Sequence, residues 1–163
     1  MSNTENSDNG KYDSVEVAKY IAAYWNDKGE SVNITKIQKL LYIAYGTWLA
    51  IKNERLCNEQ PQAWPYGPVF PTTRNRLLKL NIDNIGFNDV ADEKLKDDEE
   101  IKKLFDMIYK SSFGAWAANQ LSAWSHQKGS PWEHTTSQLN FCWGNRMDDD
   151  RIKKYFKKEV LSE

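Results

Sequence analysis

The feature that most constrains the fold is a helical pattern in residues 33–52 that is apolar on most of its sides. Its main stripe advances by three and four residues through Ile34, Ile37, Leu41, Ala44, Trp48 and Ile51. Three further positions widen this stripe: Leu40, Tyr45 and Leu49. A helix with such a wide apolar surface is usually covered on several sides. We therefore expect it to be the central helix, with other helices packed around it.

Shorter amphipathic patterns predict the surrounding helices. Apolar residues recur at helical spacing after Asp13, in residues 72–80, after the acidic run of residues 97–100, in residues 117–124 and after residue 150. Residues 81–92 mix apolar side chains with Asn, Asp and Gly, which suits loops or a small hairpin. The predicted class is mainly α: a single compact domain of about six helices, with a small β-hairpin and an extended connection.

That extended connection is residues 63–71, in which prolines, a glycine and large aromatic side chains are concentrated. Proline fixes its own φ angle and biases the preceding residue toward extended geometry. The segment is therefore expected to be rigid and to turn. Residues 1–12 have almost no apolar side chains, so we expect a flexible tail before a domain that spans residues 13–163.

Composition and charge limit the classes of partner. A chain of 163 residues with 40% hydrophobic and 28% charged residues is typical of one soluble domain. The net charge of −1 provides no general field for a phosphate backbone, so nucleic acid is not an expected partner. No apolar run is long enough for a membrane span, and no leader pattern is present, so we expect a cytoplasmic protein. Seven Trp and eight Tyr favour a protein partner.

Few residues offer catalytic or metal-binding chemistry. The two cysteines, Cys57 and Cys142, and the two histidines, His126 and His134, lack the close paired spacing of zinc ligands. Nothing near either cysteine indicates an activated thiolate, and Cys142, between two aromatic residues, resembles a small core residue. His126 is expected to serve the end of a helix, with a binding or pH-sensing role as the alternative. We predict no catalytic residue, no metal and no cofactor, with a cysteine- or metal-dependent enzyme as the alternative.

Five basic residues could form a modest positive face: Arg74, Arg76 and Lys79, together with Lys36 and Lys39. A nucleic-acid surface usually also places aromatic side chains among the basic ones, whereas the aromatic residues nearby belong to apolar stripes. A solvated helix face is the preferred interpretation.

Three segments together resemble the SocA-like antitoxin domain, also called Panacea, which includes phage-associated proteins of the GepA type. The first is Ile37-Gln38-Lys39-Leu40-Leu41-Tyr42, and the second is Ala63-Trp64-Pro65-Tyr66-Gly67-Pro68-Val69-Phe70-Pro71. The third consists of Leu121-Ser122, His126 and Pro131-Trp132. The sequence departs from the family pattern at Arg74, where members often carry Tyr, and at Ser125, which replaces Thr.

The resemblance implies a helical domain that binds and neutralises a cognate toxin encoded nearby, by direct protein contact and without catalysis. The alternatives are a phage-encoded inhibitor of a host defence protein and a nucleic-acid-binding regulator of an operon. Family members pair with many toxins, so we expect the motif residues to build the scaffold and the partner to bind elsewhere. Trp64 and Tyr66 are then expected to be buried against the central helix, with Gly67 and Pro68 setting the turn.

Overall fold

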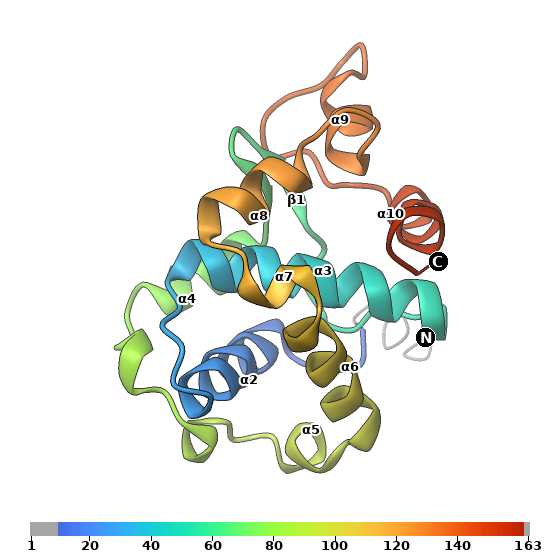
Figure 1. Cartoon of the computed structure of the whole chain (residues 1–163). Helices are drawn as coiled ribbons and strands as arrows, with labels where there is room; N and C mark the ends of the chain where they lie inside the picture. Colours follow the sequence, from blue (N-terminus) through green and yellow to red (C-terminus); the bar gives the residue numbers. More distant parts are fainter. Residues whose placement is uncertain (1–9, 162–163) are drawn as a thin grey trace, which may run out of the picture.

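The computed structural model describes residues 10–161. Within this range the chain forms nine α-helices, eight of them arranged around the long helix α3, and a two-stranded antiparallel sheet is the only sheet (Figure 1). The helices are α2 (Ser14–Asp27), α3 (Ile34–Lys52), α4 (Pro71–Leu77), α5 (Glu93–Asp97), α6 (Glu99–Lys110), α7 (Ser112–Ala115), α8 (Ala118–Ser125), α9 (Pro131–Thr136) and α10 (Asp149–Phe156). The chain also forms 3-10 turns at Ile82–Asn84 and Phe87–Asp89, and a π-helical turn at Lys157–Leu161. The predicted mainly helical class is confirmed.

Helix α3 is the centre of the structure, as its apolar pattern predicts. All fifteen residues from Lys36 to Ala50 are buried. Helices α2 and α6 pack on one side of it, while α8 and the hairpin pack on the other and α10 lies across its carboxyl-terminal half (Figure 1). The α10 contact is close, because a Cβ atom at Gly46 would lie 2.3 Å from the Phe156 ring. A larger residue at position 46 would therefore push α10 away from the core.

Side-chain caps set the starts of the longer helices. Asp13 accepts hydrogen bonds from the amides of Val15 and Glu16 at the start of α2. Asn33 does the same for Lys36 in α3, with an Oδ1 to N distance of 2.8 Å. Such caps satisfy amides that have no partner inside the helix. In the acidic run, Asp98 has this role at α6.

The hairpin lies in the proline-rich segment and not in residues 81–92. Strands β1 (Gln62–Trp64) and β2 (Gly67–Val69) pair in the register Gln62 with Val69, Ala63 with Pro68 and Trp64 with Gly67. Pro65 and Tyr66 form the tip between them. The expectation that Gly67 and Pro68 set the turn is therefore wrong, because both residues belong to β2 and pair with β1. Residues 82–89 instead form the two 3-10 turns. The rigid segment is therefore a hairpin, while the Asn- and Asp-rich segment forms no strand in the described part of the chain.

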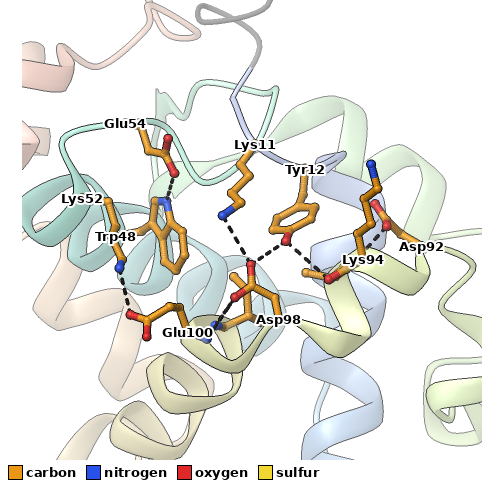
Figure 2. Close-up of polar contacts among 11 residues, drawn as sticks. Lys11, Tyr12, Trp48, Lys52, Glu54, Asp92, Lys94, Asp98 and Glu100 are labelled. Atoms are coloured by element: carbon orange, nitrogen blue, oxygen red, sulfur yellow. Dashed lines mark hydrogen bonds and ion pairs between the residues drawn. The ribbon is translucent and has the colours of Figure 1, made fainter.

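The end of the expected flexible tail is in fact part of the fold. Residues 1–9 of that tail lie outside the described residues, but the Tyr12 amide donates to the Leu56 carbonyl at 3.0 Å, and Tyr12 is buried. Its hydroxyl donates to Asp98 at 2.5 Å, and Lys11 lies 3.4 Å from the same carboxylate (Figure 2). Lys11 also lies over the ring of Trp48. These contacts join the start of the described chain to α3 and α6, so the fold begins before residue 13.

Candidate functional site

The hairpin is fixed to the amino-terminal half of α3 by the side chain of Gln38. Its Oε1 accepts a hydrogen bond from the Phe70 amide at 2.6 Å, and its Nε2 donates to the Phe70 carbonyl at 3.3 Å. One side-chain amide thus pairs with both backbone groups of the residue that follows β2. Gln38 is buried, so these bonds replace contacts with water that both partners would otherwise need.

The neighbouring residue, Lys39, is the most unusual charged group in the structure. Its side chain is almost fully enclosed, with 2% of the residue exposed, and Nζ donates to the Pro68 carbonyl at 2.9 Å. No carboxylate pairs with it among residues 10–161. Burial lowers the pKa of Lys39 to about 8. A buried lysine usually has an ionic partner, so this one needs an explanation.

Gly67 allows the hairpin to approach both α3 and α8. Its φ angle of +114° lies in the region that favours glycine. A Cβ atom there would lie 2.4 Å from Ser125 Oγ and 3.3 Å from Lys39 Cε. The Ser125 hydroxyl donates to the Ser122 carbonyl, which keeps it against α8. The second motif of the sequence therefore contacts the first and the third at this one glycine.

The third motif holds the other strand of the hairpin. Trp132, the second residue of α9, donates from Nε1 to the Trp64 carbonyl at 2.7 Å. The ring of His126, at the carboxyl end of α8, packs against Trp132 with 5.2 Å between ring centres. The Nδ1 atom of His126 is buried and has no hydrogen-bond partner within the described part of the chain. His126 thus lies at the carboxyl end of α8, and the contact that its ring makes there is with Trp132 of α9.

These elements surround an open groove of about 650 Å³. Its residues come from the amino-terminal half of α3, the hairpin, α4 and α8. The groove is lined by Asn33, Ile34, Thr35, Gln38, Lys39, Trp64, Tyr66, Val69, Arg74, Ala118, Asn119, Ser122, Ala123 and His126. Seven of these positions belong to the three motifs. The groove is therefore the candidate functional site.

The remaining motif residues have other positions. Leu40, Leu41, Tyr42 and Leu121 are buried in the core. Pro71 and Pro131 are the first residues of α4 and α9, where a proline costs no helical hydrogen bond. The structure thus divides the motif residues between core, turns and groove.

The expected burial of Tyr66 is wrong, and that of Trp64 is only partial. Tyr66 is 76% exposed because it lies at the tip of the two-residue turn, where no other element covers it. Trp64 is half-buried, with its indole nitrogen bonded to Gln62 Oε1 at 3.1 Å. Aromatic character alone did not distinguish a core position from a turn tip.

The five basic residues do not form one surface. Arg74 and Arg76 on α4 and Lys79 just after it are exposed, as a solvated helix face requires, but Lys36 and Lys39 are buried. The reason is that α3 is covered on all sides over this stretch, so even its lysines are enclosed. The wide apolar pattern of residues 33–52 is the sequence signal that could have predicted this burial. Among the groove residues, Arg74 is exposed, and its departure from the family pattern places a positive charge there.

The residues with catalytic or metal-binding chemistry do not form a cluster. Cys57 is buried and its thiol pKa is raised by burial, whereas Cys142 is exposed, which contradicts its expected place in the core. Cys142 lies in the loop between α9 and α10, beside Trp143, which is also exposed. The described residues contain no group of three or more His, Cys, Asp or Glu that could hold a metal ion. Among residues 10–161, no helix has the length and apolar composition needed to cross a lipid bilayer.

Comparison with known families agrees with the three motifs. A family model described as "Antitoxin SocA-like, Panacea domain" matches residues 37–133, which include all of α3 after its first turn, the hairpin, α8 and the start of α9. Neither the curated proteins nor the solved structures compared with the chain gave a match.

Proposed function

Because the chain belongs to the family of SocA-like antitoxins with a Panacea domain, we propose that it binds and neutralises a cognate toxin encoded nearby. The neutralisation is by direct protein contact in the cytoplasm, without catalysis. The observation that carries this proposal is the family match, which extends over more than half of the chain. The matched range contains all three motifs, and residues of each motif line the groove.

The surface of the protein supports a protein partner. Tyr66, Leu139 and Trp143 are large side chains with more than half of their area exposed. Tyrosine and tryptophan supply much of the binding energy at protein interfaces. Tyr66 belongs to the candidate groove, and Trp143 packs against Trp132, the residue that holds the hairpin. Aromatic side chains that could contact a partner therefore lie at the tip of the hairpin and in the loop after α9.

The alternatives receive less support from the structure. A regulator that binds nucleic acid would need a continuous basic face, and the burial of Lys36 and Lys39 divides the expected one. An enzyme that used Cys57 as its nucleophile would need an accessible thiolate, whereas Cys57 is buried and burial raises the pKa of its thiol. A phage-encoded inhibitor of a host defence protein would use the same kind of protein contact, and the identity of the partner separates it from an antitoxin.

Co-expression with the product of the adjacent gene tests the proposal. The adjacent gene alone is expected to stop growth, and co-expression of this protein is expected to restore it. The two proteins should then purify as a complex through size-exclusion chromatography. A non-toxic neighbour that never associates with the protein would refute the proposal.

A further inference from the structure

The groove defined above has apolar walls and charged groups of only one sign. Ile34, Trp64, Val69, Ala118 and Ala123 supply much of the apolar wall. The charged side chains among its lining residues are those of a lysine and an arginine, and no Asp or Glu of the described chain is among them. The groove is thus locally positive on a protein whose net charge is −1. Its charge complements a negative group on an otherwise apolar ligand.

The buried ammonium of Lys39 is the centre of this argument. Within the described residues it has one hydrogen-bond acceptor, the Pro68 carbonyl, although an ammonium has three N–H donors. Burying an unpaired charge is unfavourable, and an anion in contact with it would remove much of that cost. Arg74 contributes a second, exposed positive charge to the groove.

The backbone adds to the positive character of the groove. The first residues of α3 and the first residues of α8 both contribute to its lining. The amino-terminal end of a helix carries a partial positive charge. Three features, the Lys39 ammonium, the Arg74 guanidinium and the two helix ends, therefore favour an anion in the groove.

We propose that the groove receives a carboxylate-bearing segment of the protein partner, with an Asp or Glu side chain directed to Lys39 and apolar neighbours against the groove walls. This inference rests on the proposed antitoxin function and adds the chemistry of the contact. A carboxylate fits better than a phosphate, because one buried ammonium matches a single negative charge and the apolar walls do not solvate a dianion. The groove volume of about 650 Å³ is in the range of sites that enclose a small ligand or a few side chains.

An array of capped pentapeptides tests this directly on the full chain, without the toxin. Each peptide has Glu, Gln or phosphoserine at its centre, with flanking residues drawn from Leu, Val, Phe, Trp and Ala in all combinations. The best Glu peptides are expected to bind at least about tenfold more tightly than their Gln counterparts, because the ionic contact is largely desolvated. Equal binding of Glu and Gln peptides across the array would overturn the proposal, and so would tighter binding of phosphoserine peptides.

Two lysines of α3 provide a matched pair of variants. Lys39→Met should abolish the preference for Glu, whereas Lys36→Met should retain it, because Lys36 is also buried on α3 but does not line the groove. Arg74→Gln, at an exposed position, should weaken Glu peptides severalfold without affecting the fold. A Glu preference that survives in Lys39→Met would contradict the inference. Because the array needs no toxin, a negative array beside positive growth rescue would refute only the groove chemistry.

Discussion

Replacing Lys39 with Met should stabilise the protein near neutral pH. The pKa of Lys39 lies at about 8 instead of its ordinary 10.5, so the protonated form is disfavoured in the folded state. At about 1.4 kcal/mol per pKa unit, this difference corresponds to a cost of about 3 kcal/mol in the free energy of folding. The variant loses the hydrogen bond to the Pro68 carbonyl, which offsets about 1–2 kcal/mol. Since Met nearly matches the size of the lysine stem, the net gain should be about 1–2 kcal/mol.

The stability difference between Lys39→Met and the wild type should also depend on pH. A lysine whose pKa is lowered by folding costs stability fully below pH 8, and the cost disappears as the pH rises from about 8 to 10.5. The advantage of Lys39→Met over the wild type should therefore shrink over that interval. Urea unfolding of both proteins at a series of pH values measures the difference, with the exposed Lys79→Met as the control that should show no such trend. The reasoning is wrong if Lys39→Met is the less stable protein at neutral pH, or if the difference in unfolding free energy does not change with pH.

Three further changes test the contacts that form the site and the amino-terminal connection. Gly67→Ala should cost about 2–4 kcal/mol, because it combines a φ angle of +114° with a Cβ atom 2.4 Å from Ser125 Oγ; urea unfolding measures the loss. Trp132→Phe should cost about 1–2 kcal/mol and speed amide hydrogen exchange in the hairpin, because the Trp64 carbonyl loses its donor. Asp98→Asn should destabilise the protein at neutral pH. Desolvation alone would raise the pKa of Asp98. The hydrogen bonds from the Tyr12 hydroxyl and two backbone amides, together with the charge of Lys11, outweigh the desolvation, so the pKa of Asp98 is lowered. The stability that depends on its ionised form is present above pH 3.8 and lost as the pH falls further, so the wild type and Asp98→Asn should converge in acid.

Each of these changes has a control in the same chain. Gly29→Ala also has a positive φ angle, +79°, but no atom lies within 4 Å of the new Cβ, so it should cost clearly less than Gly67→Ala. Trp116→Phe, between α7 and α8, where the ring packs on Phe113, should leave exchange in the hairpin unchanged. Asp97→Asn replaces the exposed neighbour of Asp98 and should not alter the acid transition. Equal effects in a variant and its control would contradict the structural explanation for that contact.

The sequence predicted the centre of the fold because its apolar pattern is nearly continuous. A period of three and four residues over 19 positions specifies both the helix α3 and its central place. The hairpin was less predictable. Its backbone rigidity follows from proline and glycine, but strand pairing depends on Gln38 and Trp132, which lie far away in the chain.

The groove could be predicted only in part. The three motifs identified some of its residues together with others that lie elsewhere. Leu41 is in the core and Tyr66 is exposed, and residue type alone does not predict this difference. The charge of Lys39 suggested a solvated face, since lysine is rarely buried without a partner. Its enclosure comes from the hairpin that folds over α3, a contact between residues separated by about thirty positions. The positive groove is thus a property of tertiary packing.

Titration of the purified product of the adjacent gene with this protein tests the central claim most directly. Direct neutralisation predicts that toxin activity falls in proportion to the protein added and disappears at a fixed molar ratio, together with formation of a complex. Because an inhibitor that only binds stays in the complex, a substoichiometric amount of the protein should inhibit only the corresponding fraction of the toxin. Full loss of toxin activity at a small fraction of that ratio, or loss without any complex, would contradict the account.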